Sequence, residues 1–146
     1  MFVTNFYYKI LLASQDATET GLISKYFAAA GSDALEVETI TTNIIPKLQD
    51  TTYDACIINY NILKENTARL IVNMRANVLA NQVPVIVVVP QGTDLEWTQV
   101  EALYDLGVNF VTLLTSPKKA NEVLHIIKSL LDFKQKFTAG RERLYR

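Results

Sequence analysis

The chain has 146 residues, with 15 acidic and 14 basic side chains and a formal net charge of -1. Its apolar share of 49% and charged share of 20% are typical of one folded globular domain and exclude a disordered tail protein. A single cysteine, Cys56, excludes a disulfide framework and a four-cysteine zinc site. No apolar run approaches the roughly 20 residues that span a bilayer, and residues 1–9 lack a signal-peptide pattern. We therefore expect a soluble, cytoplasmic protein.

The first third of the chain alternates strand-like and helical patterns. Lys9–Ala13 is a short, continuous apolar run, which predicts a strand covered on both faces. Asp16 and Glu19 have capping-box spacing, which predicts a helix that ends at Gly31. The buried face of this helix is predicted to hold Leu22, Ile23, Tyr26, Phe27 and Ala30. Leu35–Ile40 alternates with period two, which predicts a half-covered strand nearer the sheet edge.

The same alternation continues to the last helix. We expect a short helix over Asn43–Leu48 and further strands over Ala55–Ile58, Pro84–Val89 and Val108–Leu114. Apolar spacing predicts a third helix marked by Leu70, Ile71, Met74 and Val78.

Two helix starts in the second half follow from local signals. Thr93 and Glu96 have capping-box spacing, which predicts a fourth helix that ends at Gly107. Its inward residues are predicted to be Leu95, Leu103 and Leu106. Ser116 and Pro117 supply an N-cap and a first helical residue for the last helix. That helix is predicted to bury Val123, Leu124, Ile127, Leu130 and Leu131.

Five strand–helix repeats with short connections predict a three-layer α/β sandwich, in which helices cover both faces of a parallel sheet. Five such strands most often take the order 2-1-3-4-5 of flavodoxin-like folds. Ligands in such sheets bind beyond the carboxyl ends of the strands, near the switch point between strands 1 and 3. The residues that follow Ala13, Ile58, Val88 and Thr112 are therefore the candidate site.

Three segments carry a family resemblance by their order and spacing: Tyr53–Asn61, Val83–Val88 and Ala102–Val108. Over residues 9–131 the sequence resembles the receiver domain of two-component response regulators. The three segments are similar to the family's third strand with its loop, its fourth strand, and the exit from its fourth helix. The resemblance implies a receiver-like domain over residues 9–133, an aromatic N-terminal arm over 1–8 and a basic tail or linker over 134–146.

The resemblance also implies that the family's phosphoryl chemistry is lost. Asn59 stands where the family carries the phosphoacceptor aspartate, at the end of strand 3. Ser14 and Gln15 replace the acidic pair that holds Mg²⁺. Val89 replaces the hydroxyl residue that ends strand 4, and Leu113 stands at the place of the family's lysine.

Two further positions complete the comparison with the family. An alternative alignment puts Ser116 at the lysine position, and that alignment lacks the lysine too. Phe110 matches the family's aromatic switch position.

Elementary chemistry points to the same loss. An asparagine amide cannot form an acyl phosphate, and phosphoryl transfer needs both a nucleophile and cations. Mg²⁺ is usually held by carboxylates, and Asp16, the nearest carboxylate to this site in the sequence, is better placed to cap the first helix. We expect a neutral, self-satisfied pocket of Ser14, Gln15 and Asn59, with no enzymatic activity, no metal and no cofactor.

Other residues indicate contacts with partners. Trp97 and Tyr104 lie seven residues apart and share a side of the fourth helix. Receivers commonly pair through the fourth helix and fifth strand, so we expect a partner surface here and consider a homodimer. His125 is expected at the surface, and Cys56 is expected to be a small buried hydrophobe.

We therefore expect a phosphorylation-independent pseudo-receiver that acts in signal transduction by binding another protein. One alternative is a small flavodoxin-like protein that binds a flavin or nucleotide. Another is a regulator whose basic tail leads to a DNA-binding output, because residues 118–146 carry 8 basic and 3 acidic side chains. We expect neither membrane binding nor nucleic-acid binding by the domain itself. The aromatic arm, with Phe2, Phe6, Tyr7 and Tyr8, needs a cover.

Overall fold

The structure is a computed structural model that describes residues 8–14, 17–30, 35–40, 53–60, 64–76, 83–90 and 92–144. Its elements are β1 (Tyr8–Ala13), α1 (Ala17–Ala30), β2 (Leu35–Ile40), β3 (Ala55–Asn59), α3 (Lys64–Ala76), β4 (Val85–Pro90), α4 (Trp97–Asp105), β5 (Phe110–Leu114) and α5 (Pro117–Leu144). Within these ranges, none of the helices combines the length and the apolar character that a bilayer crossing requires.

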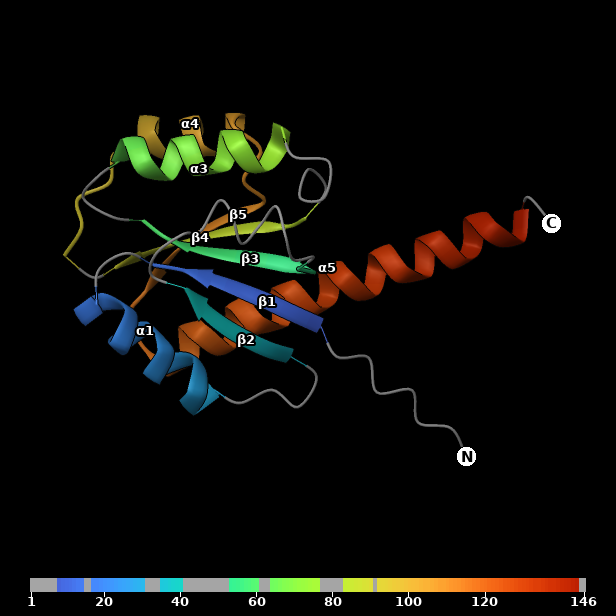
Figure 1. Ribbon diagram of the computed structural model, residues 1–146, viewed down its shortest axis with the longest axis horizontal. Coiled ribbons are helices and arrows are strands. Elements are labelled where there is room, and N and C mark those ends of the chain that lie inside the picture. Colours follow the sequence, from blue (N-terminus) through green and yellow to red (C-terminus); the bar gives the residue numbers. More distant parts are fainter. Residues whose placement is uncertain are drawn as a thin grey trace.

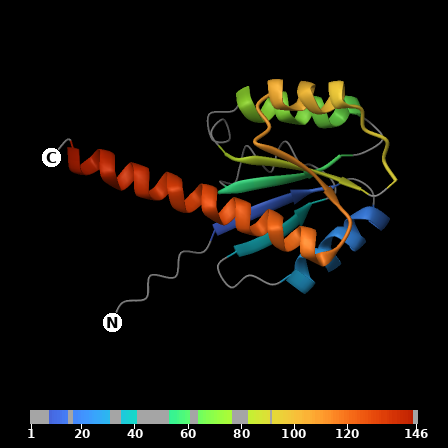
Figure 2. The same ribbon diagram turned by 180° about the vertical axis from the view of Figure 1, so that it is seen from behind.

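The strands form one parallel sheet in the order β2-β1-β3-β4-β5, which confirms the predicted fold class. Figure 1 shows α3 and α4 on one face of the sheet and α1 and α5 on the other. The view from behind agrees (Figure 2). The strand order reverses direction between β1 and β3, so the carboxyl ends of these two neighbouring strands form the switch point of the sheet.

Two buried clusters hold the three layers together, and the strands alternate between them. Along β3, Ala55 and Ile57 belong to the cluster under α1 and α5, whereas Cys56 and Ile58 belong to the cluster under α3 and α4. Every residue of β3 is buried, because helices cover both faces of the sheet. The continuous apolar runs in the sequence correspond to strands that are buried on both faces of the sheet.

Several local predictions were confirmed. The strand over residues 35–40 lies at the sheet edge, as its period of two predicted. Gly107 follows α4 with a φ of 104°, a conformation that favours glycine. Ser116 precedes α5, and its Oγ accepts a hydrogen bond from the backbone N of Lys119 (3.4 Å). His125 is exposed, and Cys56 is fully buried.

Other local predictions were wrong. The fourth helix begins at Trp97, not at the Thr93–Glu96 capping box, and the Glu96 backbone N donates instead to Gln99 Oε1 (2.9 Å). Leu22 is 50% exposed and Leu130 is 37% exposed, so each lies at the margin of its helix's apolar face. The large buried apolar side chains described for the two helices are Ile23 and Phe27 in α1 and Val123, Leu124, Ile127 and Leu131 in α5, so a narrower stripe suffices to cover the sheet.

Parts of the predicted pattern lie outside the described residues. These are the helix predicted over 43–48, Gly31, Val78, and the Gln15–Asp16 turn. At the other end, α5 is a single helix that continues to Leu144, so the domain boundary predicted at residue 133 lies within it. Both views show α5 extending past the sheet (Figures 1 and 2).

Side chains close the amino-terminal edge of the sheet. The Lys9 backbone N donates to Asp54 Oδ2 (2.7 Å), and the Asp54 backbone N donates back to the Lys9 carbonyl (2.8 Å). Asn109 does the same for β4: its Oδ1 accepts from the Val85 N (2.8 Å), and its N donates to the Val85 carbonyl (2.8 Å). Lys9, near the start of β1, and Val85, the first residue of β4, therefore have both backbone groups satisfied.

Arg75, at the end of α3, ties the same edge to the helix layer. Its guanidinium donates to the carbonyls of Val83 (2.8 Å) and Gly107 (2.6 Å) and to Asn109 Oδ1 (3.2 Å). Partial burial lowers the pKa of Arg75 from its usual value. The guanidinium therefore joins α3 to the segments that lead into β4 and β5.

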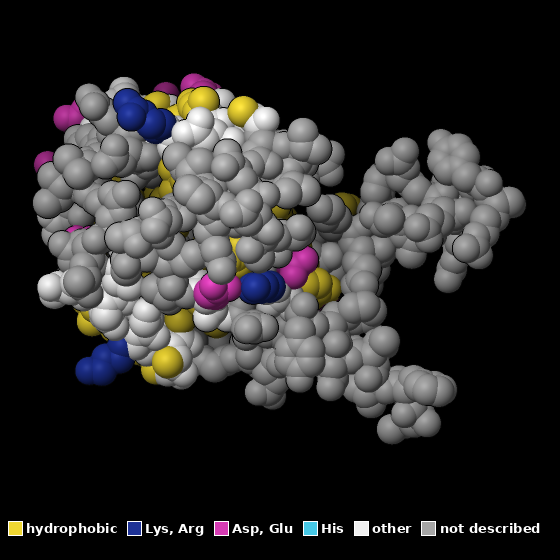
Figure 3. Space-filling model, in the orientation of Figure 1, with side chains coloured by type: hydrophobic (Ala, Val, Ile, Leu, Met, Phe, Trp, Pro, Cys, Tyr) yellow, Lys and Arg dark blue, Asp and Glu magenta, His cyan; other side chains and the backbone are white. Residues whose placement is uncertain are grey.

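A polar group on the β1–β2 side completes this edge. Lys9 Nζ lies 3.3 Å from Glu38 Oε2 and 5.1 Å from the ring centroid of Tyr53. The Tyr53 hydroxyl donates to the same carboxylate (3.1 Å), and burial, with this contact, raises the pKa of Tyr53 to about 12. Figure 3 shows acidic and basic side chains side by side in the middle of one face.

Candidate functional site

The carboxyl ends of β1 and β3 bring two sequence-predicted residues together. Ala13 pairs with Ile58, so Ser14 and Asn59 follow directly at neighbouring strand ends. Both are buried, at 1% and 3% exposure. The Asn59 Nδ2 donates to the Ser14 Oγ over 3.1 Å. The structure therefore brings Ser14 and Asn59 together at this edge of the sheet.

Two residues of α1 join this pair. Asn59 Nδ2 also donates to Glu19 Oε2 (2.8 Å). The Thr20 Oγ1 lies 2.6 Å from Ser14 Oγ and 3.3 Å from the Ser14 carbonyl. We refer to Ser14, Glu19, Thr20 and Asn59 as the Asn59 cluster. It links the first turn and a half of α1 to the ends of two central strands.

The Asn59 amide has a defined orientation with one unmatched atom. A carboxylate only accepts hydrogen bonds, so the Glu19 contact requires the NH₂ group on its side. Asn59 Oδ1 then faces the other way, buried, with no hydrogen-bond partner among the described residues. Leaving a buried acceptor unmatched costs about 1–3 kcal/mol. The polar bonding of the described part of the cluster is therefore incomplete at this acceptor atom.

Glu19 corrects the prediction of a neutral pocket. The capping-box spacing predicts a helix-cap role for Glu19, and Asp16 is the carboxylate expected nearest to this site, yet it is Glu19 that contacts Asn59. The signal was available, because the helix after β1 starts at the sheet's carboxyl edge and Glu19 lies in its first turn. Gln15 and Asp16 lie outside the described residues, so their predicted places stay predictions.

Val89 and Leu113 do not join the Asn59 cluster. They pair with each other across β4 and β5. Val89 is buried in the layer under α3 and α4, the opposite side of the sheet from α1. Leu113 is 55% exposed. The structure therefore does not bring Val89 and Leu113 together with Asn59, because strand alternation directs their side chains to another side.

Phe110 also lies apart from α4. It packs, partly buried, against the cluster under α1 and α5. Its neighbour Val111 instead packs against the cluster on the α4 side. The assignment of Phe110 as a switch aromatic therefore stays a prediction from the resemblance, and its side chain packs on the face opposite to α4.

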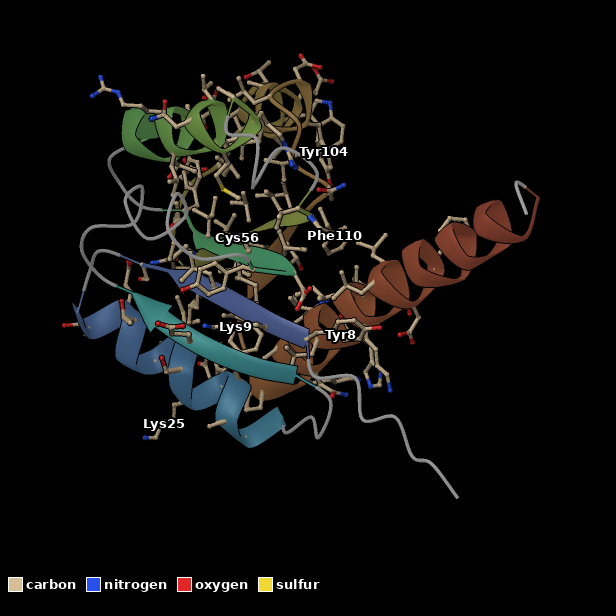
Figure 4. All side chains as sticks on the ribbon, turned by 45° about the vertical axis from the view of Figure 1, so that its right-hand side comes forward. Tyr8, Lys9, Lys25, Cys56, Tyr104 and Phe110 are labelled. Atoms are coloured by element: carbon tan, nitrogen blue, oxygen red, sulfur yellow. The ribbon has the colours of Figure 1, made fainter. Side chains whose placement is uncertain are left out.

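The predicted partner residues lie on the outer side of α4 and β5. Trp97 is 71% exposed and Tyr104 is 41% exposed. The Tyr104 hydroxyl accepts a hydrogen bond from the Val111 backbone N (3.1 Å), which joins α4 to the edge strand (Figure 4). We refer to Trp97, Tyr104 and Leu113 as the α4–β5 surface. It is the described region where three large, exposed apolar side chains come from adjoining elements.

Full burial raises the pKa of the Cys56 thiol to about 12, which disfavours the reactive thiolate. Within the residues described above, no group of three or more His, Cys, Asp or Glu side chains is placed to hold a metal ion.

The fold is shared with several solved structures. A pilus assembly protein from Burkholderia thailandensis has a TM-score of 0.66 at 19% identity, with 84% of this chain and 98% of that chain covered. A response regulator from Chloroflexus aurantiacus has a TM-score of 0.68 at 17% identity, with 86% and 98% covered. No protein-family model matches the sequence, and no curated protein sequence matches it.

A third structure gives a chemical contrast. The receiver domain of a sensor histidine kinase from Pseudomonas aeruginosa has a TM-score of 0.64 at 19% identity, with 86% of this chain and 98% of that chain covered. That domain holds a magnesium ion in its active-site cleft. At these identities the likeness establishes the receiver fold alone.

Proposed function

We propose that this chain is a phosphorylation-independent pseudo-receiver, without enzymatic activity, that acts by binding another protein. The observation that carries the proposal is the Asn59 amide. It stands at the place the family resemblance gives to the phosphoacceptor, and its NH₂ group is bonded to Ser14 and Glu19. A neutral amide offers no nucleophilic carboxylate for a phosphoryl group.

The hydrogen bonds of Asn59 also oppose a metal at this place. The one described carboxylate of the cluster, Glu19, already accepts from Asn59 Nδ2 at 2.8 Å. A cation bound to Glu19 at that point would face the amide's NH₂ group, which repels it. The state of the domain is then set by packing and by partner contact, since no charge change is available at residue 59.

The proposal does not specify the process in which the partner protein takes part. Among the similar structures are pilus-assembly proteins and signalling receivers, so the fold occurs in both settings. The α4–β5 surface is our proposed site for the partner, because it exposes aromatic side chains that are enriched at interfaces.

Intact-mass spectrometry after incubation with Mg²⁺ and acetyl phosphate tests the phosphorylation part. We expect no phosphate-sized mass gain on the wild-type chain. A covalent gain that maps to the Asn59 cluster contradicts the proposal. The variant Asn59→Asp, treated in parallel, shows whether a carboxylate at residue 59 is enough to restore phosphorylation.

Affinity capture from the native host tests the partner part. Trp97→Ala is expected to lose a captured protein that the wild type retains. Leu22→Ala is the control, because Leu22 is 50% exposed on α1, on the opposite face of the sheet from α4. Equal loss in both variants, or in neither, contradicts the assignment of the surface.

A further inference from the structure

The charges around the α4–β5 surface are all of one sign. From residue 76 to residue 117 the sequence has no Lys, Arg or His, and its acidic residues are Asp94, Glu96, Glu101 and Asp105. All four of these acidic residues are exposed. None of them forms an ion pair with another described residue. The exposed apolar side chains of this surface are therefore accompanied by negative charge that the described part of the chain does not neutralise.

Acidic and aromatic residues share one side of α4. Glu101 lies four residues after Trp97 and three before Tyr104, so it lies between the two aromatic residues on the same side of the helix. Asp105 lies four residues after Glu101 and continues this stripe. Leu103 is buried on the other side of α4, so the stripe faces away from the sheet.

The backbone edge of β5 is already occupied beside this stripe. β5 is an edge strand of the sheet, and an added strand would bond to the N–H and C=O groups of that edge. The Val111 backbone N already donates to the Tyr104 hydroxyl (3.1 Å). A partner therefore packs on the side chains of this surface, as a helix does, and not on the backbone of β5.

The acidic residues disfavour several occupants of the surface. In a twofold pair of this chain the surface would meet itself, so the carboxylates of one copy would face those of the other. Anionic lipids and nucleic-acid phosphates are repelled by the same carboxylates. A protein segment with basic residues beside its apolar residues has the complementary charge. An Arg or Lys side chain can also stack on the ring of Trp97, which is 71% exposed.

We infer that the α4–β5 surface binds a basic amphipathic helix of another protein. The apolar residues of that helix pack on Trp97, Tyr104 and Leu113. Its Arg and Lys residues pair with Glu101 and Asp105 and stack on the ring of Trp97. This partner chemistry rests on the proposed function, which places the partner at this surface.

Two synthetic helical peptides of about 20 residues test the charge preference. Both carry Leu along one face; one has Arg on both sides of that face, and the other has Glu. Fluorescence anisotropy with the full chain is expected to show saturable binding of the Arg peptide and at least about tenfold weaker binding of the Glu peptide. Binding of the Glu peptide that equals or exceeds that of the Arg peptide, or no binding of either, overturns the inference.

A third peptide tests the helical form of the partner. It is the Arg peptide with a central proline, which breaks the helix and is expected to weaken binding by about fivefold or more. Equal binding of the intact and the proline-containing Arg peptides overturns the assignment of a helix.

Paired variants of the chain locate the binding. Glu101→Lys is expected to weaken binding of the Arg peptide by about fivefold or more, and Trp97→Ala by about tenfold or more. The matched controls are Glu122→Lys on α5 and Leu22→Ala on α1, two exposed positions on the opposite face of the sheet. Both controls are expected to bind as the wild type does. Equal weakening by Glu101→Lys and Glu122→Lys would show general charge attraction and overturns the inference.

The capture experiment separates a failure of this inference from a failure of the proposed function. A captured protein that Trp97→Ala loses and Glu101→Lys retains would leave the partner surface in place and overturn the basic partner. A phosphate-sized mass gain together with an intact preference for the Arg peptide would overturn the pseudo-receiver and support the basic partner.

The other occupants are outcomes of the same series. A wild-type dimer in sedimentation that Trp97→Ala dissolves would assign the surface to a second copy. Tighter binding to phosphatidylserine vesicles or to duplex DNA than to the Arg peptide would assign it to a lipid surface or a nucleic acid. Each of these results overturns the basic-helix inference.

Discussion

At the amino-terminal edge of the sheet, side chains complete the backbone bonding of the strands. Asp54 and Asn109 accept hydrogen bonds from the backbone N–H groups of Lys9 in β1 and Val85 in β4, and the Arg75 guanidinium donates to two further carbonyls. At the carboxyl edge, Asn59 Oδ1 of the Asn59 cluster is a buried acceptor without a partner among the described residues. Side-chain hydrogen bonds therefore join the elements at the amino edge, whereas we propose that the carboxyl edge has lost the phosphoryl chemistry of a receiver.

The largest effect is expected from Arg75→Met. The substitution removes the charged donor that the Val83 and Gly107 carbonyls share. Hydrogen bonds to charged groups contribute about 1.5–3 kcal/mol each to stability. We expect a loss of about 3 kcal/mol in the free energy of unfolding, measured by urea titration. Arg69→Met, at an exposed position of the same helix, is expected to change it by less than about 0.5 kcal/mol. Similar losses of unfolding free energy in both variants would show that the Arg75 contacts at the amino edge do not stabilise the fold.

Gly107→Ala sharpens the same point. A Cβ at Gly107 would lie 2.9 Å from Arg75 Nε, and the φ of 104° strains any other residue. We expect a loss of about 2 kcal/mol, again by urea titration. Gly21→Ala in α1 meets nothing within 4 Å and is expected to stabilise the chain by about 0.5–1 kcal/mol. Destabilisation by Gly21→Ala comparable to that of Gly107→Ala would contradict this explanation.

At the carboxyl edge, Asn59→Asp is expected to give a pH-dependent loss. The introduced carboxyl would lie in a buried place at the contact distance of Glu19, so its pKa is raised above the unfolded value of about 3.9. The variant should match the wild type below about pH 4. Its free energy of unfolding should fall relative to the wild type as the pH rises toward neutrality, by about 2 kcal/mol.

The double variant Asn59→Asp with Glu19→Gln isolates the cause. Removing the Glu19 charge should recover most of the loss at neutral pH, in thermal unfolding at several pH values. A loss that is independent of pH, or that persists without the Glu19 carboxylate, would show that charge repulsion is not its source.

The smallest effect is expected from Tyr53→Phe. The variant loses the hydrogen bond to Glu38, which contributes about 1 kcal/mol near neutral pH. The folded pKa of Tyr53 is about 12, above the usual 10.0, so this contribution is present below pH 10.0 and is lost between pH 10.0 and about 12. The stability gap between wild type and variant should therefore narrow over that window. A gap that stays constant would show that Tyr53 does not titrate as the contact implies.

The sequence predicted the sheet better than the site. The strand order followed from the five strand–helix repeats, and the two-sided burial followed from apolar runs such as Val85–Val89, which are typical of strands covered on both faces. The pairing of Ser14 with Asn59 followed from the switch-point rule. Side chains alternate between the two faces along β4 and β5. This alternation places Val89 and Leu113 on the side of the sheet opposite to Asn59.

Other features depend on three-dimensional placement that no local pattern carries. The position of Glu19 in the sequence fits a local capping rule. That rule gave no reason to expect its contact with Asn59. The Arg75 contacts span 8 and 32 residues along the chain and join segments that meet only after the sheet forms. The family resemblance predicts a tail or linker over residues 134–146, whereas α5 continues as a helix to Leu144, beyond the part of the chain that the resemblance covers.

An NMR titration of the wild-type chain with Mg²⁺ and beryllium fluoride, a phosphoryl mimic, tests the central claim most directly. The side-chain amide of Asn59 and the backbone amides of Ser14 and Thr20 report on the cluster itself. We predict that these signals do not move at concentrations that saturate a Mg²⁺-binding receiver domain measured alongside. Saturable shifts centred on the Asn59 cluster would show that this edge still binds a phosphoryl group and would contradict the account.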